Sequence, residues 1–149
     1  MTGSSHGGMA ERILLSVVLP LGGMFTGFLL AGVGIVVGLP ERSASGIAVL
    51  GTLLGVVAMS HMAPRAIPNA SRFSIARRIV AGVVGFLATS AAGRFLSFLG
   101  LDVDALSYSS SVWAVAEEGL SMLLILGSML VAGVTALGRP SLANDSVAR

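Results

Sequence analysis

The chain has 149 residues, of which 54% are hydrophobic and only 11% are charged, and its mean hydropathy is +0.93. A water-soluble domain carries about 25% charged residues, so the composition excludes that class and indicates an integral membrane protein. The net charge of +2 is too small to build a nucleic-acid-binding face, and we expect no nucleic-acid partner. The absence of cysteine excludes disulfides, thiolate metal sites and cysteine nucleophiles.

The first half of the chain contains two uncharged apolar runs. Polar residues 1–12 are expected to be flexible, and residues 13–38 then exceed the ~20 residues that cross a bilayer, which predicts a helix that tilts or kinks at Pro20. Residues 44–62 predict a second helix. Both runs hold small residues at GxxxG-type spacing, which predicts close backbone contacts with another helix or a dedicated face for a partner. These helix-packing candidates are Gly23, Gly27, Gly34, Gly38, Gly51 and Gly55.

Residues 63–78 form the longest polar segment, and it is basic without any acid. Pro64 and Pro68 argue against a helix through its first half. Residues 71–78 fit a short amphipathic stretch with Phe73 toward lipid, and a solvated loop is the alternative. Four arginines here are candidates for contacts with lipid headgroups, namely Arg65, Arg72, Arg77 and Arg78.

The second half contains two more apolar runs. Residues 79–101 predict a third helix, which carries Arg94 inside the apolar run. An acidic, serine-rich connection follows at residues 102–111, and residues 112–138 predict a fourth helix. The last segment, 139–149, is short and polar, which is typical of a disordered tail.

Arg94 and two glutamates predict a polar seam between the third and fourth helices. Arg94 lies about 10 Å below the outer end of its run, and Glu117 and Glu118 lie about 8 Å into theirs, at ~1.5 Å per residue. A charge inside the bilayer needs a partner, so we expect Arg94 to pair with one glutamate, with Ser90 and Ser121 nearby. The pair either fixes the register of the helices or marks a transport site.

Arginine counts predict the orientation of the four spans. An even number of spans places both termini and residues 63–78 on one side of the membrane. That side holds seven arginines, whereas the other side holds only Arg42 outside the apolar runs. The positive-inside rule therefore predicts that both termini and the 63–78 loop are cytoplasmic, and we expect a prokaryotic plasma membrane.

Few residues suggest cofactor or catalytic chemistry. His61 lies between Met59 and Met62, but a single histidine near the membrane is only a weak metal candidate, and no metal or other cofactor is expected. Phosphate-binding, zinc-protease and catalytic-triad motifs are missing from the sequence. The sequence therefore does not predict an enzyme.

The sequence predicts an all-α, polytopic integral membrane protein, with four transmembrane helices in a compact bundle. The predicted role is a non-catalytic accessory or structural subunit of a membrane complex or homo-oligomer, whose partners are membrane lipids and other membrane subunits or itself. The alternative is a small oligomeric transporter or channel, with the polar seam of Arg94, Glu117, Glu118 and Ser121 along its route.

Overall fold

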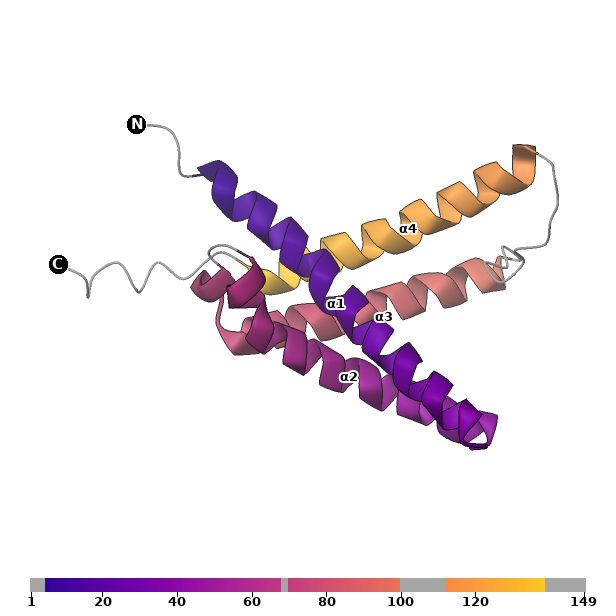
Figure 1. Cartoon of the computed structure of the whole chain (residues 1–149). Coiled ribbons are helices and arrows are strands. Elements are labelled where there is room, and N and C mark those ends of the chain that lie inside the picture. Colours follow the sequence, from indigo (N-terminus) through magenta and orange to yellow (C-terminus); the bar gives the residue numbers. More distant parts are fainter. Residues whose placement is uncertain (1–4, 68–69, 100–111, 139–149) are drawn as a thin grey trace.

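The computed structural model describes residues 5–67, 70–99 and 112–138, with the backbone alone at 5–7, 41 and 112–118. These ranges form an all-α protein in which four long helices pack together (Figure 1). Each helix is long and apolar enough to cross a membrane, which confirms the predicted class and the four membrane helices. The helices are α1 (Ser5–Val36), α2 (Glu41–Ala66), α3 (Ile75–Phe98) and α4 (Val112–Leu137), and a short 3-10 helix, η1 (Ala70–Arg72), precedes α3.

The first two helices extend beyond the apolar runs that predicted them. Helix α1 begins at Ser5, so part of the polar segment expected to be flexible is helical, and it continues without a break through Pro20. Helix α2 includes Pro64 and ends at Ala66. A proline this close to a helix end removes only one intrahelical hydrogen bond, so α2 continues for two residues beyond Pro64.

Helix α3 begins four residues before the apolar run and ends three residues before the end of that run. Ser74 precedes its first turn, and the Arg77 backbone N–H donates to Ser74 Oγ at 3.3 Å. This N-cap satisfies one of the free donors at the helix start, which explains why the helix includes the two neighbouring arginines. Because α3 ends at Phe98, Arg94 lies only four residues from that end, about 6 Å along the axis.

Helices α1 and α2 form a hairpin whose middle part is closely packed by glycines. A Cβ atom at Gly23 would lie 2.5 Å from Val56 Cγ2, and one at Gly55 would lie 2.8 Å from Thr26 Cβ. Such distances are too short for a real side chain, so the two backbones approach as closely as GxxxG-type packing allows. The turn between the helices contains Gly38, whose φ of 89° lies in the left-handed region that glycine adopts without strain.

The contacts that join this hairpin to α3 and α4 involve the first half of α1 and Val56 of α2. Gly82 of α3 packs against Val56 and Leu19, and Gly85 packs against the ring of Pro20. On α4, Gly133 packs against Ser16. Beyond these contacts the α1–α2 hairpin and the α3–α4 pair diverge, and their far ends are well separated in Figure 1.

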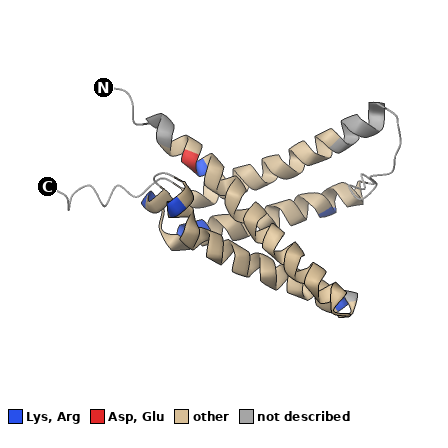
Figure 2. Cartoon of the chain, viewed as in Figure 1, with Lys and Arg blue, Asp and Glu red and all other residues tan. Residues whose placement is uncertain are grey.

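The buried core lies near one end of the bundle, where α1 and α3 begin and where α2 and α4 end. We call this the arginine-rich end, because Figure 2 shows most of the described basic residues there. Phe73, two residues before α3, is 1% exposed and belongs to this core, so it does not face lipid as the amphipathic interpretation expected. The core residues are Leu15, Leu19, Ala63, Ile67, Ala70, Phe73, Ala81 and Leu137.

The outer surface of the bundle is strongly apolar. Phe25 and Phe28 of α1 are 66% and 67% exposed, and leucines and valines on all four helices are also exposed. Such a surface would cause aggregation in water, but it matches the hydrocarbon of a bilayer. This pattern and the lengths of the helices are those of an integral membrane protein.

Candidate functional site

The structure describes one side of the predicted polar seam. Arg94 is exposed near the end of α3, and the exposed Ser90 donates its hydroxyl hydrogen to the Phe86 carbonyl of its own helix at 3.0 Å. Ser121 of α4 is buried, with 3% of its surface exposed. The backbone of Glu117 and Glu118 lies in α4, but their side chains fall outside the described atoms. The pairing of Arg94 with a glutamate therefore stays a prediction.

The described hydroxyl groups on the helices mostly donate to carbonyls of their own helix. Thr26 bonds to Gly22 O at 2.9 Å, and Thr52 bonds to Ala48 O at 2.8 Å. Ser16, Thr89 and Thr135 make bonds of the same kind at 2.6–2.9 Å. A hydroxyl that already donates to its own backbone contributes little to a polar path through the bundle.

The six candidate packing glycines occupy different environments. Gly23, Gly27, Gly51 and Gly55 lie at the contact between α1 and α2, where a Cβ atom would meet the other helix. Gly34 has looser neighbours, the nearest being Leu39 Cδ1 at 3.3 Å. Gly38 has nothing within 4 Å of a Cβ position and serves the turn instead of a helix contact. The tightest glycine face of α1 is therefore occupied by α2 of the same chain.

An apolar cavity of about 80 Å³ lies where the two hairpins begin to diverge. Met24 and Phe28 of α1 line it, together with residues of α2 and Phe86 of α3. Thr52 is the one hydroxyl residue in the lining, and its hydroxyl donates to Ala48 O. The cavity can hold an apolar group, and its lining offers no charged side chain.

The arginines of the predicted headgroup-binding segment are not equivalent. Arg65, Arg72 and Arg77 are exposed at the arginine-rich end, whereas Arg78 is only 4% exposed. The sequence contained a signal for this difference, because Arg78 precedes Ala81, Gly82 and Gly85 at the three-, four- and seven-residue spacing of one helix face. These small residues form the buried face of α3, so the same periodicity places Arg78 inside the packing.

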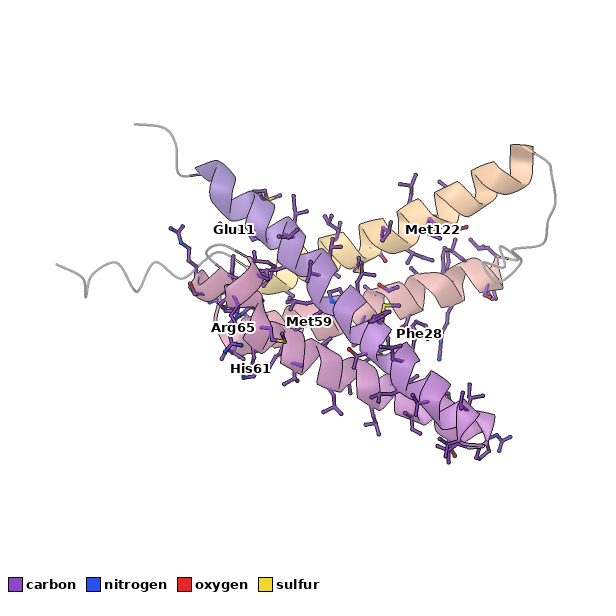
Figure 3. All side chains as sticks on the ribbon, viewed as in Figure 1. Glu11, Phe28, Met59, His61, Arg65 and Met122 are labelled. Atoms are coloured by element: carbon purple, nitrogen blue, oxygen red, sulfur yellow. The ribbon has the colours of Figure 1, made fainter. Side chains whose placement is uncertain are left out.

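Polar groups of α1 also gather at this end. The Arg12 side chain donates through Nη2 to the Val134 carbonyl of α4 at 2.9 Å. Glu11, the preceding residue, lies on α1 at the arginine-rich end in Figure 3 and has one buried carboxylate oxygen, Oε2. The bond from Arg12 connects the start of α1 with the end of α4.

His61 lies on α2, between Met59 and Arg65 in Figure 3. It is exposed, and its Nδ1–H donates to Val57 O at 2.9 Å, one turn back on the same helix. Met59 instead packs against Gly22, where a Cβ atom would lie 2.5 Å from the Met59 methyl carbon. Within the described part of the chain, no group of three His, Cys, Asp or Glu residues is close enough to hold a metal ion.

Comparison of the chain with protein families, with curated proteins and with solved structures finds no match.

Proposed function

We propose that this protein is a non-catalytic accessory or structural subunit, which works by helix contacts with other membrane subunits or with copies of itself. The observation that supports this role is the divergence of the two hairpins (Figure 1). The described inter-hairpin contacts at Gly82, Gly85 and Gly133 lie in the half of the bundle that includes the arginine-rich end, and the hairpins separate toward the opposite end. A transmembrane helix of a partner could pack against the exposed apolar faces of the diverging helices and bury them.

The chemistry of the cavity between the α1–α2 hairpin and α3 favours a protein helix over a polar solute. Its lining includes Met24, Phe28 and Phe86, and the described hydroxyls on these helices mostly bond to their own backbones. In a bilayer, helices associate through close packing and shape, not through apolarity alone. The exposed aromatic side chains Phe25 and Phe28 of α1 offer a surface for such packing.

The charge distribution supports an orientation with both termini in the cytoplasm of a prokaryotic cell. Five described arginines lie at the arginine-rich end, whereas two lie toward the opposite end, Arg42 beside the α1–α2 turn and Arg94 near the end of α3. The positive-inside rule assigns the arginine-rich end to the cytoplasm. Because the chain lacks cysteine, the orientation can be tested with Ser71→Cys and Ser43→Cys, both at exposed positions. In intact cells an impermeant maleimide should label the Ser43 variant alone, and the reverse pattern would refute the orientation.

Native mass spectrometry tests the accessory role most directly. The protein would be extracted from its own membrane in a mild detergent and its mass measured without denaturation. We expect a complex with unrelated subunits or a defined homo-oligomer. Recovery of a monomer alone, from membranes in which chemical cross-linking also detects no adduct, would refute the proposal.

Single cysteines can then locate the contact. Phe28→Cys places a thiol beside the cavity, and Leu54→Cys places one at an exposed position on α2, with nearly equal exposure of 67% and 65%. If a partner helix packs against the Phe28 face of α1, the Phe28 variant should cross-link to it in the membrane and the Leu54 variant should not. Equal cross-linking at both positions would indicate random collision.

The alternative function is a small oligomeric transporter or channel. The burial of Ser121 in α4 favours this alternative. If Arg94 and a glutamate pair as the sequence predicts, the buried hydroxyl would add a polar group to a route through the bundle. The protein in liposomes should then show a flux that Glu117→Gln or Glu118→Gln changes while folding is retained. An unaltered flux, or none, would leave the accessory role.

A further inference from the structure

Arg78 is the one charged residue of the described core. It is the fourth residue of α3, and 96% of its surface is covered, since its exposure is 4%. The core cluster includes Phe73 before it and Ala81 after it. Arg78 therefore lies within the packed interior of the arginine-rich end, and its three neighbours in the sequence-predicted headgroup set lie outside.

The Arg78 side chain has unsatisfied hydrogen-bond donors. Its Nε and Nη1 atoms are buried and have no hydrogen-bond partner among the described residues. The guanidinium group stays protonated in proteins, so each of these nitrogens keeps its N–H donor. A buried cation without an anion is strongly unfavourable, which indicates that an anionic ligand completes the site.

A second orphaned polar atom lies at the same level of the bundle. Gly82 of α3 faces Val56 of α2. The two helices run in opposite directions, so one turn toward the arginine-rich end leads from Gly82 to Arg78 and from Val56 to Ser60. Ser60 is fully buried, and its Oγ has no hydrogen-bond partner in the described structure. A hydroxyl can donate to an anion that Arg78 also holds.

The depth of Arg78 fits a phosphate at the membrane surface. Arg78 lies three residues after the start of α3, about 4.5 Å along the axis. With 24 residues, α3 is about 36 Å long, so roughly 3 Å at each end extends beyond a hydrocarbon core of ~30 Å. Arg78 is therefore near the boundary between hydrocarbon and headgroups.

The charges around this position also favour an anion. Arg12, one of five arginines at this end, has a buried Nε without a hydrogen-bond partner, although its Nη2 is satisfied by Val134 O. Glu11 is the one acid among the described residues of this end, and it already has an interaction within the fold. Positive charge thus remains in excess after Glu11 is counted.

From these observations we infer that Arg78 and Ser60 form a binding site for a phosphate group, carried by an anionic phospholipid or free in solution. Arginine recognises phosphate through several N–H donors in a fixed plane, which lysine cannot reproduce. The site would anchor the arginine-rich end to the membrane surface and neutralise the core of the bundle.

The test measures the thermal unfolding midpoint of the purified full chain in detergent. The added probes are dioctanoyl phosphatidylglycerol, dioctanoyl phosphatidylcholine and inorganic phosphate at constant ionic strength. A bound ligand raises the midpoint with a saturable dependence on its concentration. Stabilisation by phosphatidylglycerol alone assigns the site to a lipid, and stabilisation by inorganic phosphate as well assigns it to the phosphate group itself. If neither anionic probe gives a saturable rise, the inference is refuted.

Two variants separate the site from general surface charge. Arg78→Gln should abolish the response, whereas Arg72→Gln, which removes an exposed charge at the same end, should retain it. Without any probe, Arg78→Gln should unfold at the same or a higher temperature than the parent, because an unpaired buried charge is removed. An equal response in both variants would overturn the inference.

Ser60→Ala provides an independent test if Arg78→Gln does not fold. Removal of one hydrogen bond to an anion should raise the half-saturating concentration of the active probe about tenfold. Ser45→Ala is the matched control, because Ser45 is an exposed hydroxyl of the same helix and donates to Arg42 O. A half-saturating concentration that Ser60→Ala leaves unchanged would exclude Ser60 from the site.

Discussion

Substitution of Gly27 by alanine tests whether the α1–α2 hairpin depends on direct backbone contact. A Cβ atom at this position would overlap the Ala48 carbonyl oxygen and Thr52 Oγ1 of α2. Two of the three nearest atoms are backbone atoms, which cannot turn away as a flexible side chain could. The added methyl therefore forces the two helices apart.

The expected cost follows from this geometry. Carbon atoms pack best at about 3.5–4.0 Å, so the helices must separate by roughly an ångström at Gly27. Overpacking typically costs about 1–3 kcal/mol, and we expect about 3 kcal/mol here because the obstructing atoms belong to the backbone. Gly51, directly opposite, would lose contact as the helices separate, since its Cβ position lies 2.9 Å from Gly27 Cα.

The free energy of unfolding in detergent micelles, measured by reversible denaturation, is the direct assay. Gly32→Ala is the matched control, because Gly32 lies on the same helix with nothing within 4 Å of its Cβ position. Alanine exceeds glycine in helix propensity by about 1 kcal/mol, so the control should be neutral or stabilising. If Gly27→Ala were as stable as Gly32→Ala, the close contact between α1 and α2 would be wrong.

Three further substitutions probe other parts of the fold. Gly38→Ala should cost about 1–2 kcal/mol, because alanine is strained at a φ of 89°, whereas Gly46→Ala, with open space and an ordinary helical backbone, should not destabilise the chain in the same unfolding assay. Ser74→Ala should cost about 1 kcal/mol through loss of the α3 cap, and a cost near zero would refute that role. If Arg94 pairs with a glutamate of α4 as the sequence predicts, Arg94→Leu should assemble normally and Arg94→Glu poorly, because the reversal would place a third carboxylate beside the two glutamates. Equal yields of folded protein by size-exclusion chromatography would refute the predicted pairing.

The number and class of the helices could be predicted because the membrane imposes a strong and simple requirement. Each span must be apolar over about 20 residues and must satisfy its own backbone hydrogen bonds. The helix ends were less predictable, because helices continue beyond the hydrocarbon when a cap or a tolerant residue is present. Ser74 starts α3 earlier than hydropathy indicated, and Pro64 does not stop α2.

The glycine spacings predicted close packing but not the identity of the partner helix. A GxxxG pattern permits approach from any helix, whether in the same chain or another. In the structure Gly23 and Gly27 contact α2, so this face of α1 is unavailable to a second protein. The sequence could not show which exposed apolar faces contact a partner, because hydropathy does not distinguish a residue that faces lipid from one that faces another protein.

The burial of Arg78 was not predicted from the sequence, because other arginines lie close to it. Four arginines within residues 63–78 suggested one uniform basic surface, and charge counting cannot separate Arg77 from Arg78. Helix phase can separate them, because Arg78 lies on the face of Ala81 and Gly85, and the adjacent Arg77 is rotated from it by about 100°. This reasoning holds only if α3 already includes Arg77 and Arg78, and hydropathy placed the start of the helix after both residues.

The two kinds of contact in the bundle have different mechanical consequences. Glycines hold α1 against α2 at two successive levels, where Gly23 faces Gly55 and Gly27 faces Gly51, so this hairpin is one stiff unit. Helices α3 and α4 contact it through Gly82, Gly85 and Gly133, in the half of the bundle that includes the arginine-rich end. Rotation of one hairpin about that end would change the angle between the hairpins while leaving the α1–α2 glycine contacts intact. A partner helix packed against both hairpins would fix this angle, and a phosphate held by Arg78 of α3 and Ser60 of α2 would link the two hairpins. Partner binding and phosphate binding should therefore each make the other tighter, because both favour the same arrangement of the hairpins.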